Sequence, residues 1–280
     1  SGVCPPPRAP RPAPRAPGGV SRMSVSRMLE GTDSSPERRQ NMHIGIFPTS
    51  DEAAKVAAQI IIDHPHETLG VATGSTPLGL YAELRAAWRE GRFTTSSAYA
   101  LDEYVGIDAD HPERYRNVLR RELLGETGLT EDTLHTPNGL LGDPVAAAQA
   151  YDAAIGEAGV DLQILGLGSD GHIGFNEPGG SLVSRTHVEV LASSTKRDNA
   201  RFFGDDPTAV PSTCITQGLG TIMEAKVLLL VAFGAGKAKA VAQLVEGGVS
   251  AAWPCTIMQM HPEVYVLVDE EAAAGLKHAD

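Results

Sequence analysis

Short apolar runs alternate with amphipathic stretches along the chain from about residue 42 onward. Apolar runs of about four to eight residues bounded by turn residues are typical of buried strands. Apolar residues three and four positions apart are typical of helices. The pattern predicts strands at 43–47, 68–73, 98–104, 160–168, 226–233 and 264–268, and helices at 51–64, 78–90, 112–124, 144–158, 236–244 and 251–258.

Strands that alternate with helices favour a single α/β domain, here residues 42–280. We predict a doubly wound, Rossmann-like fold in which a mainly parallel sheet carries helices on both faces, with one mobile lid segment. In such sheets the ligand binds at the carboxyl ends of the strands. Polar motifs follow several of the predicted strands, which places the candidate chemistry at that edge of the sheet.

Residues 1–41 have a different composition, in which prolines interleave with arginines and a Ser, Gly and Arg stretch follows. Such a composition cannot bury a core, so we predict a disordered Pro/Arg-rich N-terminal extension before the domain. The alternative function for this segment is that of a proline-rich ligand for a partner domain.

Charge excludes several classes of partner. The formal net charge is −12, and the first 41 residues carry seven Arg against three acidic residues. The remainder therefore has 16 basic and 32 acidic residues, a net charge of −16. Because so acidic a body repels nucleic acid and anionic membranes, we expect neither as a partner. An anionic small molecule would need a local basic pocket.

Cysteine usage and the length of the apolar runs indicate a cytoplasmic protein. Cys4, Cys214 and Cys255 form no CxxC pair, so neither a disulfide framework nor a zinc site is expected. The longest apolar run, residues 227–235, is far shorter than the ~20 residues that span a membrane as a helix.

Gly74, Ser75 and Thr76 follow the predicted strand 68–73 and precede a predicted helix. Free backbone N–H groups and the positive end of the helix dipole suit a phosphate at such a place. An ordinary turn with a Ser or Thr N-cap explains the same residues equally well. The GK[ST] ending of a Walker loop is missing, which argues against a nucleoside triphosphate.

Asp102 and Glu103 lie near the end of the predicted strand 98–104. Adjacent residues of a strand point to opposite faces, so at most one of these carboxylates faces a cleft at the strand end. A carboxylate there can act as a general base. The alternative is a solvated turn.

The sharpest motif combines Asp170, His172 and Glu177 in a Gly-rich loop after the predicted strand 160–168. A carboxylate on each side of an imidazole orients the ring and favours its charged form, which suits proton transfer. The spacing matches none of the common metal-binding motifs, so we expect no metal.

Arg201 and Lys237 are the remaining candidates. Lys237 follows a Gly-Ala-Gly segment at the start of a predicted helix, which is a suitable position for a phosphate contact. A single cation is usually a solvated surface charge. In a body with a net charge of −16, however, a cation near a strand end is a stronger indication of an anion-binding site.

Together these motifs resemble the glucosamine-6-phosphate deaminase (glucosamine-6-phosphate isomerase) family. The resemblance extends from about residue 42 to the end, and its two most specific motifs are LDEYVG and GHIGFNEP. The matching segments are Ala72–Tyr81, Leu101–Gly106, Leu165–Gly179, Ser184–His187, Thr195–Phe203 and Gly236–Pro262.

The resemblance implies isomerisation and deamination of glucosamine 6-phosphate to fructose 6-phosphate and ammonia, without a metal or an organic cofactor. It implies that Asp102 moves a proton between C2 and C1 of the sugar. His172, supported by Asp170 and Glu177, would open the sugar ring. The substrate is the expected partner, and a homo-oligomer is compatible with the sequence. The residues expected to hold the phosphate are Gly74, Ser75, Thr76, Arg201 and Lys237.

Some members of this family are activated by N-acetylglucosamine 6-phosphate at a subunit interface, through a Ser, an Arg and a Lys. The matching positions here are Gly180, His187 and Glu189. Glu189 reverses the charge where the phosphate of the effector would lie, so we expect no such activation.

Two other functions compete with the deaminase. A 6-phosphogluconolactonase-like hydrolase shares the fold and the phosphate pocket but has a GHTASLFP-like segment, so Glu177 discriminates between the two families. A non-catalytic sugar-phosphate-binding regulator would carry a helix-turn-helix module before the domain or would have lost catalytic residues. Residues 1–41 are too short and too rich in proline for that module, and all the predicted catalytic residues are present.

Overall fold

The computed structural model describes residues 28–29, 41–140 and 142–277. Of the extension predicted to be disordered, Met28–Leu29 is described as the short strand β1, which pairs antiparallel with β2 (Met42–Phe47). The prediction for residues 1–27 and 30–40 lies outside the described residues.

The central sheet has eight strands in the order β1-β2-β11-β10-β7-β3-β4-β6. All neighbours other than β1 and β2 are parallel, which confirms the predicted α/β fold with a mainly parallel sheet. The innermost strands read as continuous apolar runs because both of their faces are buried. The bounds are β3 (Thr68–Val71), β4 (Ser97–Ala100), β6 (Leu134–His135), β7 (Leu162–Leu165), β10 (Val227–Ala232) and β11 (Val264–Asp269).

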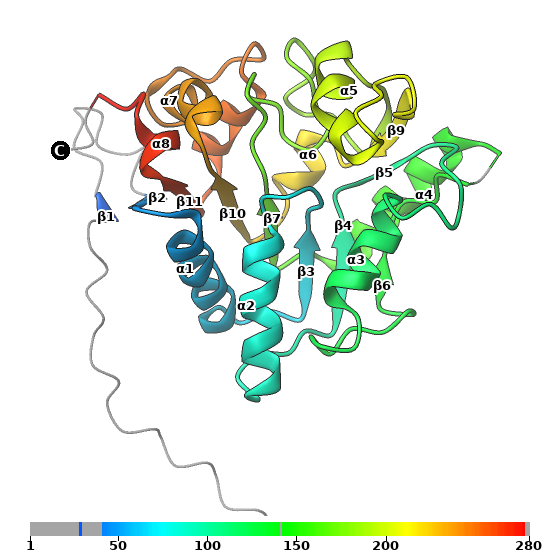
Figure 1. Ribbon diagram of the computed structural model, residues 1–280, viewed down its shortest axis with the longest axis horizontal. Helices are drawn as coiled ribbons and strands as arrows, with labels where there is room; N and C mark the ends of the chain where they lie inside the picture. The colour runs from blue at the N-terminus through cyan, green and yellow to red at the C-terminus, as the bar shows by residue number, and fades with distance from the viewer. Residues whose placement is uncertain (1–27, 30–40, 141, 278–280) are drawn as a thin grey trace, which may run out of the picture.

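The helices connect these strands, and α1, α2 and α3 lie next to one another in front of the sheet in Figure 1. Caps fix where two of them begin: the Thr49 hydroxyl accepts from the backbone of α1, and the Asp143 carboxylate accepts from that of α4. The bounds are α1 (Ser50–Asp63), α2 (Leu78–Arg89), α3 (Tyr115–Leu123), α4 (Pro144–Ala158), α5 (Ser193–Asn199), α6 (Leu219–Ile222), α7 (Ala238–Glu246) and α8 (Glu270–Ala273).

The order of the strands reverses between β3 and β7. The chain continues from β3 to β4 and β6 on one side, and from β7 to β10 and β11 on the other. Loops that leave two such neighbouring strands diverge, and ligands bind in the crevice between them. The topology therefore places the loops after β3 and β7 at the site expected for a ligand.

One predicted strand is wrong, since residues 98–104 form two strands in different sheets. β4 ends at Ala100, and β5 (Asp102–Tyr104) pairs antiparallel with β9 (Thr213–Thr216), which pairs with β8 (His187–Val190). The Ala100 carbonyl accepts from the Tyr151 hydroxyl at 2.8 Å and from Gln217 Nε2 at 2.9 Å. These side chains end the ladder of β4 and fix the point at which the chain enters the small sheet.

Two predicted helices also differ from the structure. The helix expected at 251–258 is a 3₁₀ helix, η3 (Pro254–Met260), and the one expected at 236–244 is divided into η2 (Ala235–Lys237) and α7. None of the described helices is long and apolar enough to cross a membrane.

Candidate active site

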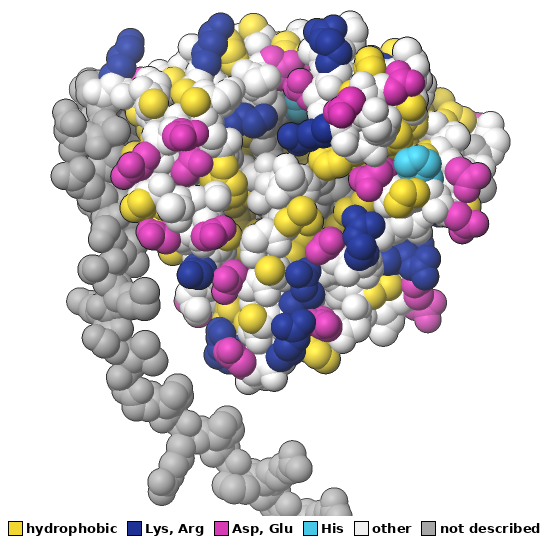
Figure 2. Space-filling view, in the orientation of Figure 1, with side chains coloured by type: hydrophobic (Ala, Val, Ile, Leu, Met, Phe, Trp, Pro, Cys, Tyr) yellow, Lys and Arg dark blue, Asp and Glu magenta, His cyan; other side chains and the backbone are white. Residues whose placement is uncertain are grey.

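A cavity of about 220 Å³ lies at the carboxyl ends of β3, β4, β7 and β10. Figure 2 shows a hollow in the upper half of this face, between the regions of α7 and α5, flanked by Lys or Arg side chains and with a histidine at its floor. Segments far apart in the sequence meet here. The predicted site residues that line the cavity are Gly74, Ser75, Thr76, Asp102, His172, Arg201 and Lys237.

The loop after β3 is held in place from below by a tyrosine of α2. The Tyr81 hydroxyl donates to the Ala72 carbonyl at 2.6 Å and accepts from the Ala72 backbone N–H at 3.0 Å. Gly74 has a φ of +89°, a conformation that favours glycine. Arg201 reaches this loop from the other side of the cavity, and its Nη2 lies 3.4 Å from Ser75 Oγ.

Lys237 ends η2, which follows β10, and it lines the same cavity as Arg201. Burial lowers the pKa of the Lys237 ammonium, the nearby Arg201 lowers it further, and Asp198 and Asp170 oppose this shift. Two cations that face one partly buried cavity repel each other. An anion between them would relieve that repulsion, so this end of the cavity suits a phosphate.

Asp102 is the first residue of β5, directly after the turn between the two sheets, and its side chain is 6% exposed. Burial raises the pKa of its carboxyl to about 8, and the neighbouring Glu103 adds to the shift. No hydrogen bond from the described residues opposes this rise. A carboxyl with such a pKa can accept and return a proton near neutral pH.

Glu103 faces the other way, as the strand geometry predicts. Its carboxylate is fully buried and accepts hydrogen bonds from the backbone N–H groups of Tyr104, Tyr115 and Arg116, at 2.9, 3.0 and 2.9 Å. Burial raises its pKa, and these hydrogen bonds oppose the rise. Glu103 therefore caps the start of α3 and does not line the cavity.

Asp170 and His172 form a hydrogen-bonded pair in the loop after β7. His172 Nδ1 lies 2.8 Å from Asp170 Oδ1, which also accepts from the His172 backbone N–H at 3.2 Å. The hydrogen bond from the imidazole lowers the pKa of Asp170 to about 2. A Cβ at Gly168 would overlap the imidazole of His172, so the ring packs where only glycine fits.

The same loop is attached to the small sheet that carries Asp102. The Phe175 backbone N–H donates to Thr216 Oγ1 at 3.1 Å, and Thr216 pairs with Asp102 across β9 and β5. A Cβ at Gly174 would lie 3.6 Å from Asp102 Oδ2, and Gly174 has a φ of +58°. The His172 loop and Asp102 are therefore held against each other.

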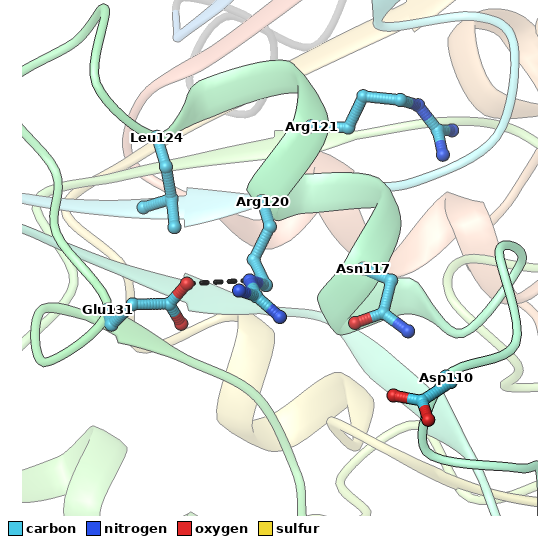
Figure 3. A pocket seen from close by; sticks show the side chains of 6 residues that line it. All are labelled: Asp110, Asn117, Arg120, Arg121, Leu124 and Glu131. Atoms are coloured by element: carbon cyan, nitrogen blue, oxygen red, sulfur yellow. Dashed lines mark ion pairs between the residues drawn. The ribbon is translucent and has the colours of Figure 1, made fainter.

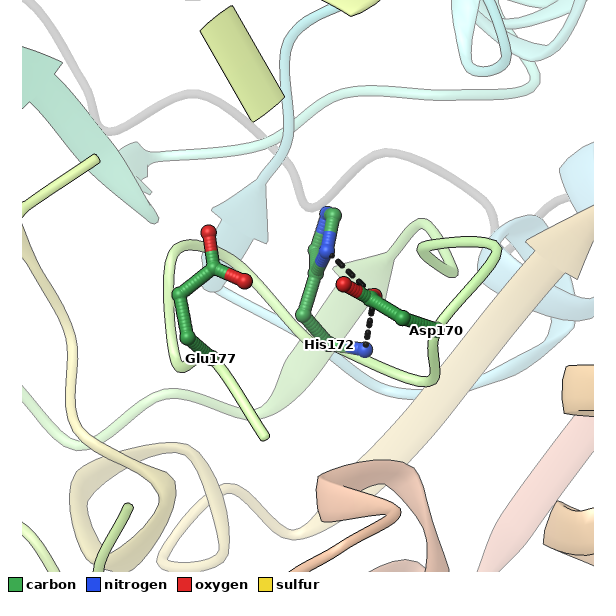
Figure 4. Close-up of side chains that lie close together, drawn as sticks. All are labelled: Asp170, His172 and Glu177. Atoms are coloured by element: carbon green, nitrogen blue, oxygen red, sulfur yellow. Dashed lines mark hydrogen bonds and ion pairs between the residues drawn. The ribbon is translucent and has the colours of Figure 1, made fainter. Parts of the chain in front are cut away.

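Glu177 lies on the side of His172 opposite Asp170, as Figure 4 shows. Neither Asp170 nor Glu177 is among the residues that line the cavity. Ligand atoms of the three side chains lie within 4.8 Å of one another, which is a spacing that could hold a metal ion. The Thr195 hydroxyl of α5 donates to Glu177 Oε1 at 2.6 Å.

Sequence reasoning missed several residues that line the cavity. Thr195 and Asn199 belong to the segment Thr195–Phe203, in which the sequence indicates only Arg201 as a site residue. Tyr115 follows the LDEYVG motif by nine residues. The Tyr104 hydroxyl accepts from both Tyr115 (3.1 Å) and Asn199 (3.0 Å). Such contacts join α3, α5 and β5, and no local pattern in the sequence predicts them.

A second, shallow depression of about 520 Å³ lies over α3 (Figure 3). An ion pair of 2.6 Å between Arg120 and Glu131 occupies it. None of the predicted site residues lines it, so we assign no ligand to this surface. Its lining residues are Asp110, Asn117, Arg120, Arg121, Leu124 and Glu131.

The positions that match the effector-binding residues lie away from the cavity. His187 and Glu189 are both on β8, where His187 Nε2 lies 3.3 Å from Glu189 Oε2. Gly180 is exposed in the loop before β8. The charge reversal at Glu189 is therefore already partnered by a histidine of the same strand.

The chain matches a family described as glucosamine-6-phosphate isomerases/6-phosphogluconolactonase over residues 48–266. It is 52% identical over 246 residues to a glucosamine-6-phosphate deaminase of Beutenbergia cavernae, a match that covers 85% of this chain and 94% of that protein. It is 50% identical over 246 residues to the glucosamine-6-phosphate deaminase of Mycolicibacterium smegmatis, with the same coverage.

Solved structures agree with these matches. A monomeric glucosamine-6-phosphate deaminase superposes with a TM-score of 0.79 at 36% identity, covering 83% of this chain and 99% of that one. A 6-phosphogluconolactonase from Trypanosoma brucei has a TM-score of 0.63 at 23% identity, covering 83% and 98%, which shows the common fold alone. The cavity, its motifs and these similarities lead to one conclusion: the chain belongs to the glucosamine-6-phosphate deaminase family.

Proposed function

We propose that this chain isomerises and deaminates glucosamine 6-phosphate, giving fructose 6-phosphate and ammonia. The observation that carries the proposal is that one cavity holds a buried carboxyl with a pKa of about 8, an oriented histidine and two cations. Each of these groups has a separate role in this reaction.

The phosphate would bind between Arg201 and Lys237, against the backbone of the Gly74–Thr76 loop. Charge-assisted hydrogen bonds to a phosphate are strong, and they fix the sugar relative to the acid and base groups. Fixed in this way, the sugar would extend from the cations toward Asp102 and His172.

Ring opening comes first, because the proton on C2 becomes acidic only next to a free aldehyde. Asp170 holds His172 through Nδ1, which leaves Nε2 for the substrate. Nε2 of His172 would accept the proton of the C1 hydroxyl and donate it to the ring oxygen O5, so that the C1–O5 bond breaks and the aldehyde forms. Glu177, which lies on the side of the His172 imidazole opposite Asp170, would support this proton transfer.

Asp102 would then remove the proton from C2 and return it to C1, while the aldehyde oxygen gains the proton that the amino nitrogen loses. The amino aldehyde thereby becomes a 2-imino sugar with a hydroxyl on C1. Water adds to the imine carbon, and ammonia leaves with the electron pair of the C–N bond, which gives the ketone of fructose 6-phosphate. A positioned general acid or base contributes about 10²–10⁴-fold in each such step. The segment of α5 and η1 (Ala200–Phe202), which carries Arg201, would be the predicted lid.

The test is to supply the purified chain with glucosamine 6-phosphate and with 6-phosphogluconolactone, and to measure ammonia and acid release separately. We expect ammonia and fructose 6-phosphate from the first substrate and no turnover of the second above the spontaneous rate. Lactone hydrolysis without ammonia release would replace this proposal with that of a hydrolase.

A further inference from the structure

The hydroxyl of Thr195 makes a contact that the reaction scheme above does not use. Thr195 is on α5, is 4% exposed and lines the cavity. Its Oγ1 donates a hydrogen bond of 2.6 Å to Glu177 Oε1. It is the only described side chain that hydrogen-bonds to the Glu177 carboxylate.

Glu177 has few other means of being held in place. It follows a loop that is anchored by the Phe175 backbone N–H and by the Asn176 side-chain amide, but its own side chain extends beyond those anchors toward His172. A carboxylate on a flexible side chain needs a partner to keep one orientation, and a buried hydroxyl supplies such a partner. Among the described residues, Thr195 of α5 is therefore the partner that can hold the Glu177 carboxylate in one orientation.

The same short segment also places a cation in the phosphate end of the cavity. Arg201 follows Thr195 by six residues and reaches Ser75. α5 and η1 thus contact the ring-opening group at one end and the phosphate-binding loop at the other.

We propose that Thr195 is a positioning residue for ring opening: its hydroxyl orients Glu177 toward His172. This inference rests on the function proposed above. Thr195 does not take part in moving the C2 proton, and it does not bind the phosphate.

The test compares Thr195→Val, which removes the hydroxyl but keeps the shape, with Thr195→Ser, which keeps the hydroxyl. A hydrogen bond to a charged group corresponds to about a 10- to 100-fold change in rate. We expect Thr195→Val to lower kcat for glucosamine 6-phosphate by about that factor with little change in KM, and Thr195→Ser to restore most of kcat. Thr208→Val is the matched control, since it removes a hydroxyl–carboxylate bond to the exposed Asp206 outside the cavity.

Binding of 2-amino-2-deoxyglucitol 6-phosphate, which is permanently open, separates positioning from misfolding of α5. Its inhibition constant stays at the wild-type value in Thr195→Val if the hydroxyl acts only on ring opening. A weaker inhibition constant that parallels the loss in kcat, a normal kcat in Thr195→Val, or an equal loss in Thr195→Ser would each overturn the inference. A wild-type chain that releases no ammonia would instead remove the proposed function, and this inference with it.

Discussion

Two aspartates of the same cavity region have pKa shifts of opposite sign. Burial beside Glu103 raises the pKa of Asp102 to about 8, whereas a hydrogen bond from His172 lowers that of Asp170 to about 2. The first lies inside the fold without a hydrogen-bond partner among the described residues, and the second is partly exposed on a loop. The same side chain is thus prepared for two tasks by its surroundings alone.

The opposite shifts support the two roles proposed for these aspartates. A carboxyl that titrates near neutral pH can carry a proton between C2 and C1, and one that stays ionised can hold an imidazole in a fixed orientation. The two aspartates also belong to different structural elements. Asp102 is on a strand of the small sheet, whereas Asp170 and His172 are on a loop that is hydrogen-bonded to that sheet.

The largest effect is expected from Asp102→Asn, which keeps the shape and removes the base. We expect kcat for ammonia release to fall by about 10²–10⁴-fold, with the KM for glucosamine 6-phosphate changed much less. Asp132→Asn, at an exposed position far from the motifs, is the control and should behave as wild type. Near-normal turnover of Asp102→Asn would contradict the proposal that Asp102 is the base and that Asp170 only orients His172.

The pH dependence should follow Asp102 and not Asp170. The base is active only when deprotonated, and its pKa is about 8. We therefore expect kcat/KM to fall about tenfold for each pH unit below 8. Asp170 stays ionised throughout the range from pH 5 to pH 9 because its pKa is about 2, so it adds no second slope. Initial rates of ammonia release across this range measure the profile; a flat profile between pH 6 and pH 8 would contradict it.

Stability should change in opposite directions at the two positions. Between its ordinary pKa of 3.8 and about 8, Asp102 binds more protons folded than unfolded, so the free energy of unfolding falls as pH rises through this range. Asp102→Asn removes that loss and should melt at a higher temperature than wild type at pH 9.

For Asp170 the sign is reversed, because its pKa falls from 3.8 to about 2 on folding. Its contribution is present above pH 4 and is lost as pH falls through 2. Asp170→Asn should therefore melt at a lower temperature than wild type at pH 7. Thermal melts at both pH values measure this, and a shift of the same sign for both variants would contradict the account.

The smallest effect is expected outside both regions. Glu189 carries a negative charge at the position that matches a phosphate-binding residue of the activated family members. We therefore expect N-acetylglucosamine 6-phosphate to leave the kinetics hyperbolic and unchanged. Rates measured against substrate concentration with and without the effector are the test. Sigmoidal kinetics that the effector relieves would show that the small sheet transmits a signal to Asp102.

The sequence predicts the parts of this site that follow central strands. The apolar runs of β3, β7 and β10 and the polar residues after them bring the Gly74 loop, His172 and Lys237 to one edge. The break at Leu101 could not be predicted, because the apolar pattern continues through it and the hydrogen bonds that cause it come from Tyr151 and Gln217.

The small sheet and α5 were missed for a related reason. β8 is partly exposed and short, and the role of α5 depends on contacts with distant segments such as that of Thr195 with Glu177. Local periodicity carries no record of such contacts.

The proposed roles of His172 in ring opening and of Asp102 in proton transfer at C2 can be separated with a substrate analogue that needs no ring opening. Glucosamine 6-phosphate without its 4- and 5-hydroxyl groups cannot close a five- or six-membered ring. The account predicts that His172→Gln deaminates this analogue nearly as well as wild type but fails on glucosamine 6-phosphate, whereas Asp102→Asn fails on both. Equal impairment of His172→Gln on the two substrates would contradict it.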